Sequence, residues 1–334
     1  MTIQEDYRAL KENAAIGAIA RRGGIGLTGG DRASYLHGLL TNDIQALVPG
    51  TGCYAAWLTP QGRMLTDMHI FEAGDMMLLD VPADLLSVTL QRLDQFLFSE
   101  DVQIADLSET LAAVWLHGPA AASTLEKALT GISDAASWPE YRNARTEFGG
   151  APVVVARVSQ LGVPGFVVYA DPARGADLRR ALVAGGVTVA DPEAIEAARI
   201  EAGYPLFGTD LTDETIPLEA GIEDRAISMS KGCYVGQEVI VRVLHRGQGR
   251  VAKRLVALRI QGDRAQPDDM PVSGGRVFSE ARDVGGVTSI ARSPNLGTIA
   301  LGYVHRDFVA AGTQLEVATP SGRVSAVVSD PPMR

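Results

Sequence analysis

The chain has 334 residues, and 30 lysines and arginines against 40 aspartates and glutamates give it a formal net charge of −10. At about 150 residues per domain, this length predicts two or three domains that bury sizeable cores. The composition, 46% hydrophobic and 21% charged, excludes wholesale disorder. The net acidity argues against direct binding to nucleic acid, for which a basic domain is typical.

Cysteine usage and the N-terminus exclude further classes of protein. The cysteines are Cys53 and Cys233 alone, too few for a disulfide framework, a structural zinc site or a cluster held by this chain by itself. The first 22 residues carry acids early and lack an uninterrupted apolar core, so they do not resemble a signal peptide. No segment reaches the roughly 18 to 20 apolar residues of a membrane span. We therefore expect a cytoplasmic protein with no membrane partner and no metal site.

The first third of the chain predicts an α+β unit. Apolar runs bounded by turn residues indicate four strands, with a helix capped by Asp31 between the first two. Pro82 then opens a longer helix in which leucines recur every three or four positions. The strands are expected at residues 22–27, 54–58, 64–71 and 76–81.

A similar pattern returns from about residue 112, and a different one occupies the C-terminus. Strands alternate with helices, which predicts an antiparallel sheet with helices on one face. A further helix is expected between Asp191, a good N-cap, and Gly203, a good C-terminal stop. After residue 251 short strands replace the helical pattern and favour a small closed β domain. The strands are expected at 113–117, 153–158, 166–169, 256–260, 276–278, 286–290, 298–304, 314–317 and 324–328, and the helices at 119–129 and 172–184.

Charge is segregated along one part of the chain. From Glu201 through Asp224 there are seven acids and no lysine or arginine, whereas residues 239–259 contain six cations and no acid. An octapeptide, Lys-Gly-Cys-Tyr-Val-Gly-Gln-Glu at residues 231–238, separates the two stretches. The basic stretch could contact phosphate, a polyglutamate tail or only solvent. Alternation of polar and apolar residues after Arg242 suggests a strand edge, where cations discourage aggregation.

Glu201 stands out within the acidic stretch. It falls in the last turn of the helix that Gly203 is expected to end, where the helix macrodipole disfavours a carboxylate by roughly 0.3 to 1 kcal/mol. A carboxylate can accept two parallel N–H donors, which suits a guanidine-like edge such as that of a pterin. The alternative is an exposed glutamate that serves solubility.

Cys233 is the second unusual residue. Lys231 precedes it by two positions, and a nearby cation favours a reactive thiolate. The glycines at 232 and 236 would allow close approach of a ligand or partner. The alternative is a small buried hydrophobic residue, the usual role of a single cysteine. Cys53 has no such neighbours, and we expect it to serve packing.

The octapeptide resembles the KGCYxGQE signature of the YgfZ family, folate-binding factors of iron–sulfur cluster assembly related to the glycine-cleavage T-protein. Weaker matches extend over roughly residues 20 to 330 and mark the superfamily more than this branch. They comprise Asp31-Arg32-Ala33 with Thr41-Asn42-Asp43, Tyr54 with Gly62-Arg63 and Asp67, residues 199–203 with Asp210, Pro217 and Glu219, and residues 285–289 and 300–304.

The resemblance implies an α+β protein whose three domains form a ring around a central folate channel. The first domain would combine residues 1–110 and 196–245, the second would span 111–195, and a β-barrel would occupy 246–334. Tetrahydrofolate or a derivative is the implied cofactor, with Glu201 on the pterin edge. The further implied folate contacts are Asn42, Asp43, Arg63, Tyr204, Gln237 and Arg242.

The implied function is that of an accessory factor for assembly or repair of iron–sulfur proteins, with those proteins or their assembly machinery as partners. Cys233 and Lys231 would act at the channel mouth on a cluster, a sulfur species or a partner. The rival implication is tetrahydrofolate-dependent one-carbon transfer of the aminomethyltransferase or demethylase type. For this rival, the match places Ser87 at the catalytic aspartate of the T-protein, with Asp84 one turn away. A third hypothesis is a scaffold that binds tRNA or protein through the basic stretch.

Overall fold

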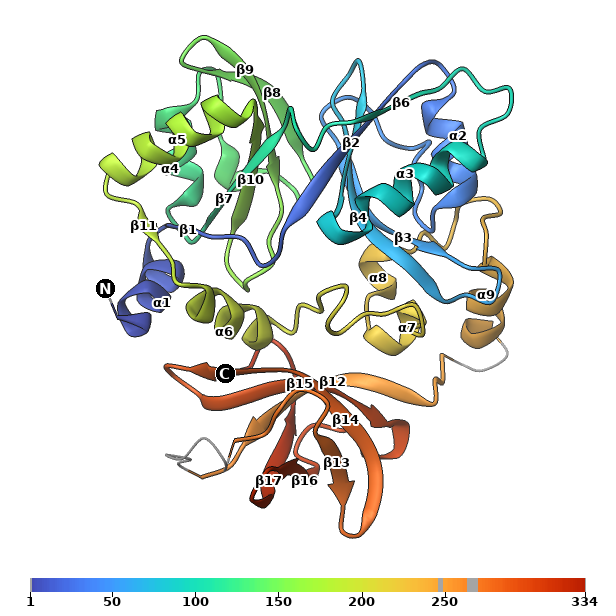
Figure 1. The fold of residues 1–334 in the computed structure, drawn as a ribbon, viewed down its shortest axis with the longest axis vertical. Helices are drawn as coiled ribbons and strands as arrows, with labels where there is room; N and C mark the ends of the chain where they lie inside the picture. The colour runs from blue at the N-terminus through green and yellow to red at the C-terminus, as the bar shows by residue number, and fades with distance from the viewer. Residues whose placement is uncertain (1, 246–248, 263–269, 334) are drawn as a thin grey trace.

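Three sheets, one of them closed into a barrel, organise the computed structural model, which describes residues 2–245, 249–262 and 270–333. Figure 1 shows the two open sheets side by side above the barrel. A connecting segment of short helices lies between the pair of sheets and the barrel. The predicted pair of α+β units and the predicted closed β domain are thus confirmed. The helices of the connecting segment are α6 (Pro192–Ala202), α7 (Pro217–Ala220) and α8 (Glu223–Ala226).

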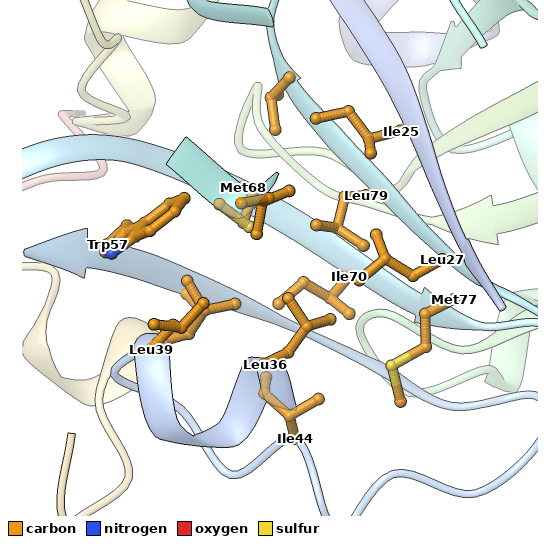
Figure 2. Close-up of a cluster of buried hydrophobic side chains, with 14 of the residues drawn as sticks. Ile25, Leu27, Leu36, Leu39, Ile44, Trp57, Met68, Ile70, Met77 and Leu79 are labelled. Atoms are coloured by element: carbon orange, nitrogen blue, oxygen red, sulfur yellow. The ribbon is translucent and has the colours of Figure 1, made fainter. Parts of the chain in front are cut away.

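The first sheet is antiparallel and has the order β3-β4-β5-β2-β6. In Figure 2, side chains from its strands meet Leu36 and Leu39 of helix α2 (Arg32–Leu39), and Trp57 closes one end of this core. Burying such side chains stabilises the fold by about 1.5 to 3 kcal/mol each. The remaining elements are β2 (Arg22–Thr28), β3 (Gly52–Leu58), β4 (Met64–Glu72), β5 (Met77–Pro82), the short 3-10 helix η1 (Ala83–Leu85), α3 (Leu86–Gln95) and β6 (Gln103–Asp106).

The second sheet includes the start of the chain and has the order β11-β1-β7-β10-β9-β8. Strand β1 (Ala15–Ile16), which follows helix α1 (Ile3–Glu12), pairs with both β7 and β11. The chain therefore enters the second sheet before it forms the first. The other elements are β7 (Ala112–His117), α4 (Ala121–Ala128), η2 (Ala135–Ser137), β8 (Asn143–Phe148), β9 (Ala151–Arg157), β10 (Gly165–Ala170), α5 (Pro172–Ala184) and β11 (Thr188–Val189).

The barrel closes in the order β12-β15-β14-β13-β16-β17. Its interior is filled by small and branched side chains, among them Leu258, Val277 and Val317, as expected for a barrel with a packed core. All six predicted strands lie within the observed ones. The elements are β12 (Lys253–Ile260), β13 (Arg276–Ser279), β14 (Arg282–Ser293), β15 (Gly297–His305), η4 (Arg306–Phe308), β16 (Gln314–Thr319) and β17 (Gly322–Ser329).

A buried arginine joins the connecting segment to the barrel. Arg199 of α6 is fully buried and donates to the Asp210 carboxylate at 2.7 Å, to the Ser289 hydroxyl at 2.7 Å and to the backbone carbonyl of Tyr204 at 2.6 Å. A buried charge is stable only when it is paired and hydrogen-bonded in this way. The network therefore fixes the segment after α6, which carries Tyr204, against the barrel.

The strand edge expected after Arg242 is wrong, because this stretch belongs to helix α9 (Gln237–His245). Ile240 is buried and Val243 and Leu244 pack beside it, so apolar residues three and four positions apart face the protein. Over so few residues, alternation and the helical period are hard to distinguish. Arg246 lies outside the described residues.

Candidate functional site

The loop that carries Cys233, residues 231–236 and here called the cysteine loop, is anchored at its first residue. Lys231 is buried, and its ammonium donates to the backbone carbonyls of His37 at 2.5 Å, Leu40 at 2.5 Å and Asn42 at 3.1 Å. These carbonyls lie at the C-terminal end of α2, where unpaired carbonyls and the macrodipole favour a cation. Burial lowers the pKa of Lys231 to about 8. Since the three N–H groups of Lys231 all donate to these carbonyls, Lys231 anchors the start of the cysteine loop to the end of α2.

The other end of the cysteine loop presses against the turn between β3 and β4. Gly236 has a φ of 85°, and a Cβ there would lie 2.5 Å from the carbonyl oxygen of Thr59. Gly62, also at positive φ, would meet the Val239 side chain at 2.9 Å. Glycine at both positions permits a backbone approach that no other residue allows. The loop is thus fixed on both sides of Cys233.

The two cysteines occupy opposite environments. Cys233 is exposed, whereas Cys53 is buried in the core of the first sheet, in agreement with the packing role expected for it. Burial raises the pKa of the Cys53 thiol to about 12. Cys53 therefore stays a protonated thiol at neutral pH, and Cys233 alone of the two is accessible to a partner.

Glu201 is buried, and its carboxylate already has donors from its own chain. The Tyr7 hydroxyl lies within 2.7 and 2.9 Å of the two carboxylate oxygens, the Ser293 hydroxyl donates at 2.5 Å, and the Lys11 ammonium lies at 3.0 Å. Tyr7 and Lys11 belong to α1. These contacts explain why an acid is tolerated in the last turn of α6, although they also compete with any ligand for the carboxylate.

The remaining predicted folate contacts, Tyr204 apart, lie on the segments that surround the cysteine loop. Asn42 donates to the backbone carbonyls of Tyr54 and Arg225, at 2.8 and 3.0 Å, and so ties strand β3 to helix α8. Asp43 lies beside the cysteine loop, where its carboxylate is 3.3 Å from His37. Arg63 is exposed in the β3–β4 turn and donates to the carbonyl of Glu214, while Gln237 begins α9 and Arg242 is exposed on that helix. The turn and the start of α9 are neighbours, because Gly62 approaches Gly236 and Val239 closely.

Tyr204 belongs to a buried polar and aromatic group where the two sheets meet the connecting segment, here called the central cluster. Its hydroxyl lies 3.4 Å from both His69 Nε2 and Gln160 Nε2. The Arg225 guanidinium lies 4.1 Å from the centre of the Tyr204 ring and 4.8 Å from that of Tyr54. Burial raises the pKa of Tyr204 and lowers that of His69. At neutral pH the Tyr204 and His69 rings are therefore neutral, and the Arg225 guanidinium beside them carries a positive charge.

Two buried polar atoms of the central cluster have no hydrogen-bond partner within the described part of the chain. They are Oε1 of Gln160 and one terminal nitrogen of Arg225, whereas Nδ1 of His69 lies 3.7 Å from the Asp80 carboxylate. Leaving such a group unpaired costs about 1 to 3 kcal/mol, and native proteins rarely leave several together. An amide-bearing ligand could supply an acceptor to Arg225 and a donor to Gln160. The cluster thus has the chemistry of a small-molecule site.

Buried ion pairs support the central cluster from the first sheet. Arg22 donates to the Asp80 carboxylate at 2.6 Å and to that of Asp67 at 3.2 Å, and the Tyr54 hydroxyl donates to Asp67 at 2.8 Å. The hydroxyl of Tyr169 in the second sheet also donates to Asp80. Burial alone would raise the pKa of Asp80, but Arg22, His69 and Tyr169 together outweigh burial and the pKa falls to about 2. This network joins the two sheets beneath Tyr54.

Sequence reasoning missed Gln160, His69 and Arg225. Arg225 is the first cation after the long acidic stretch, a signal that could have singled it out. Gln160 and His69 sit in ordinary local sequence and become neighbours only through the packing of the two sheets.

The described residues contain no group of three histidine, cysteine, aspartate or glutamate side chains placed to hold a metal ion. Among the helices of the described ranges, none is both long and apolar enough to cross a membrane.

Comparison with known proteins gives consistent matches along the chain. Residues 1–231 match the GCVT N-terminal domain, and residues 253–333 match the glycine cleavage T-protein C-terminal barrel domain. The aminomethyltransferase of Rubrobacter xylanophilus is 32% identical over 303 residues, which cover 90% of this chain and 79% of that protein. A putative chloroplastic transferase of Arabidopsis thaliana is 27% identical over 330 residues, 98% of this chain and 73% of that protein.

A solved structure supports the same fold. The glycine cleavage system aminomethyltransferase T of Bartonella henselae superposes with a TM-score of 0.86 at 21% identity, covering 99% of this chain and 89% of that one. The domain matches and the relatives agree with the two open sheets and the closed barrel. The chain therefore belongs to the GcvT-like aminomethyltransferase family, the family of the glycine cleavage T-proteins.

Proposed function

We propose that this protein binds a reduced folate in the central cluster and supports assembly or repair of iron–sulfur proteins through Cys233. The observation that carries this proposal is the exposed thiol of Cys233 on a loop fixed by Lys231 and Gly236. Such a thiol is presented to a partner rather than to the interior. The YgfZ-like octapeptide, of which this loop is the main part, favours the same function.

The unpaired atoms of the central cluster fit a folate. A pterin is a flat heteroaromatic ring with an amide and an amino group on one edge, so it needs both donors and acceptors in one plane. Within the described part of the chain, Gln160 offers an unpaired acceptor and Arg225 an unpaired donor, and the Arg225 guanidinium is held between the rings of Tyr54 and Tyr204. A bound reduced folate would supply one-carbon chemistry, and these side chains would bind and orient it.

Glu201 is a secondary candidate for contact with the pterin. A pterin would reach its carboxylate only if Tyr7 and Lys11 gave up their contacts with it. Removing donors from a buried carboxylate costs about 1 to 3 kcal/mol for each bond. We therefore assign the first contacts of the pterin edge to Gln160 and Arg225.

Cys233 would act together with another molecule. One thiolate cannot hold an iron–sulfur cluster, which normally has four protein ligands, so a cluster at this position would be shared with a client protein. Lys231 would serve as a positioning residue, since its donors already bind backbone carbonyls. The site therefore suits a transient encounter with a partner.

Titration with tetrahydrofolate, followed by protein fluorescence, tests the folate site. Gln160→Leu removes the unpaired amide, and we expect the dissociation constant to rise about tenfold, the effect of one lost hydrogen bond of about 1.4 kcal/mol. Gln103→Leu, on an exposed edge strand, is the matched control and should bind like the wild type. Equal affinity of all three proteins would contradict the central folate site.

Complementation tests the thiol. In cells that lack this protein, Cys233→Ala should fail to restore the activity of a [4Fe–4S] enzyme, although the purified variant should bind tetrahydrofolate normally. Cys53→Ala is the matched control at the buried cysteine and should restore activity if it folds. Full rescue by Cys233→Ala would remove the thiol from the function.

Aminomethyl transfer is the second candidate, because the curated relative with 32% identity is an aminomethyltransferase. Ser87, which the resemblance places at the catalytic aspartate, and the nearby Asp84 are both exposed at the start of α3. The purified protein would be assayed with tetrahydrofolate and an aminomethyl donor. Turnover that Asp84→Asn abolishes and Cys233→Ala preserves would favour the transferase over our first proposal.

A further inference from the structure

We propose that helix α7 and the barrel form a second small-molecule site, which binds an acidic amino acid: Glu219 accepts its ammonium group, and cations of the barrel hold its carboxylates. This inference goes beyond the proposed function and depends neither on Cys233 nor on a folate in the central cluster. The site is a cavity of about 720 Å³ between α7 and the outer face of the barrel, here called the barrel hollow. In Figure 1, α7 lies directly above β12 at the top of the barrel.

Three neighbouring strands build the floor of the barrel hollow. Tyr303 of β15 lies opposite Gly286 of β14, and Gly286 lies opposite Arg276 of β13. Residues directly opposite each other in a sheet project from the same face, so these three positions form one row across the barrel surface. Because Gly286 has no side chain, a gap remains in this row between the tyrosine ring and the arginine.

The backbone does not require glycine at position 286. Its φ lies outside the left-handed region, and among the described atoms a Cβ there would meet only the Gly275 carbonyl oxygen, at an ordinary 3.7 Å. Gly285 differs, since a Cβ there would lie 1.9 Å from the carbonyl oxygen of Tyr303. A glycine inside a strand weakens it and often marks a place where a ligand approaches the backbone closely. The evident effect of Gly286 is to keep the barrel hollow open.

A buried acid forms the wall of the barrel hollow on the side of α7. Glu219 is only 8% exposed, and its carboxylate forms no ion pair within the described ranges. Burial raises the pKa of Glu219, and Lys253, the backbone N–H of Ile216 and Arg63 offset part of this rise. Buried glutamates are normally paired with a cation. Glu219 therefore offers a carboxylate to a cationic group of a ligand.

The rim of the barrel hollow carries three exposed cations, Lys253, Arg276 and Arg282. The Lys253 ammonium lies 4.9 Å from the centre of the Tyr303 ring and forms no ion pair within the part of the chain that the structure describes. Arg276 pairs with Asp283 at 2.7 Å, but a guanidinium has five N–H donors, so it keeps others for a second acceptor.

The charges around the barrel hollow select the class of ligand. After Asp283 neutralises one rim cation, two cations remain at the rim and one buried acid remains at the wall. A complementary ligand carries two carboxylates and one ammonium group, which is the charge pattern of aspartate and glutamate. The cavity volume is also in the range of small-ligand sites. In a protein with a net charge of −10, such a cation-rich surface attracts anions that the rest of the surface repels.

Calorimetric titration of the full-length protein with L-glutamate tests the site, and glutarate, which has the two carboxylates without the ammonium group, is the matched probe. We expect Glu219→Gln to weaken binding of L-glutamate by about tenfold or more and not to weaken binding of glutarate. Lys253→Met should weaken binding of both. Lys127→Met, at an exposed position on α4, is the control and should change neither.

Gly286→Val tests the cavity itself. Valine suits a strand and has room at this position, so the variant should unfold at the temperature of the wild type while it binds L-glutamate about tenfold more weakly or less. Absence of binding to the wild type at up to about 10 mM L-glutamate would overturn the inference. Equal affinity of the wild type, Glu219→Gln and Gly286→Val would overturn it as well. Neither result bears on the proposed function, which uses other residues.

Discussion

The central cluster and the cysteine loop differ in almost every physical respect. The cluster is buried, combines side chains from both sheets and the connecting segment, and contains polar atoms that find no hydrogen-bond partner among the described residues. The loop is short, presents an exposed thiol and has its backbone fixed by Lys231 and two glycines. A buried site with unpaired polar groups selects a small ligand, whereas an exposed thiol on a fixed loop meets another macromolecule. In the proposed function, folate binding and reaction with a partner would therefore take place at different sites.

The largest effect is expected from breaking the charge network below the central cluster. Arg22→Met leaves the buried carboxylates of Asp67 and Asp80 without their cation, and we expect the free energy of unfolding to fall by about 3 to 5 kcal/mol. Urea titration would measure it. Arg276→Met, in an exposed pair with Asp283, is the control and should cost less than about 1 kcal/mol. Similar losses in the two variants would contradict a charge-dependent cluster.

The anchor of the cysteine loop should give the next effect. Lys231→Met removes three hydrogen bonds from the end of α2, and we expect a loss of about 2 to 3 kcal/mol together with altered alkylation of Cys233. Chemical unfolding and reaction with iodoacetamide would measure the two. Lys127→Met, at an exposed position, should change neither. An unchanged rate at Cys233 would show that the loop keeps its shape without the anchor.

Acid should weaken the cluster more than the loop. The pKa of Asp80 is about 2 when folded and 3.8 in its ordinary state, so its ionised form stabilises the fold above about pH 4, and this contribution is lost as the pH falls through about 2. The difference corresponds to about 2 kcal/mol. Stability measured between about pH 2 and about pH 5 should decline less steeply in Asp80→Asn. Parallel declines would disprove the contribution.

The smallest effect is expected from a pair of glycine substitutions, which distinguishes the cost of a steric contact from the cost of backbone strain. Gly236→Ala adds a Cβ at positive φ and presses it on the Thr59 carbonyl, whereas Gly131→Ala adds one at a similar φ with open space around it. We expect the first to cost about 1 to 2 kcal/mol more than the second. Thermal unfolding of the pair would measure the difference. An equal loss of stability in the two variants would mean that the cysteine loop and the β3–β4 turn can move apart to accommodate the added Cβ.

Local patterns predicted most of the fold. Apolar runs between turn residues gave strands close to β2 through β5 and to those of the barrel, and the caps Asp191 and Gly203 bounded α6 correctly. The pattern failed where elements are short or ambiguous. Strands β1 and β11 are two residues long and exist only because distant strands pair with them, and the alternation after Arg242 predicts a strand edge where the chain forms α9.

The site was predictable only where one segment carries it. The octapeptide identified Cys233 and Lys231 as residues to examine because they lie within three positions of each other. The partners of Lys231 are backbone carbonyls of α2, which no side-chain pattern reports. Glu201 drew attention through the helix dipole, but its contacts with Tyr7 come from the other end of the chain. Contacts between distant segments depend on the fold, and local sequence does not encode them.

The pairing of β1 with β7 and β11 has a consequence for synthesis on the ribosome. Strand β1 is translated long before β7 and β11, the strands with which it pairs. The first sheet can therefore form while α1 and β1 are still unpaired, since β1 can pair only after β7 and β11 have been translated. Tyr7 and Lys11 reach Glu201 only after α6 has appeared. Helix α1 and strand β1 are thus among the last elements to reach their native positions, and their contacts then join the second sheet to α6.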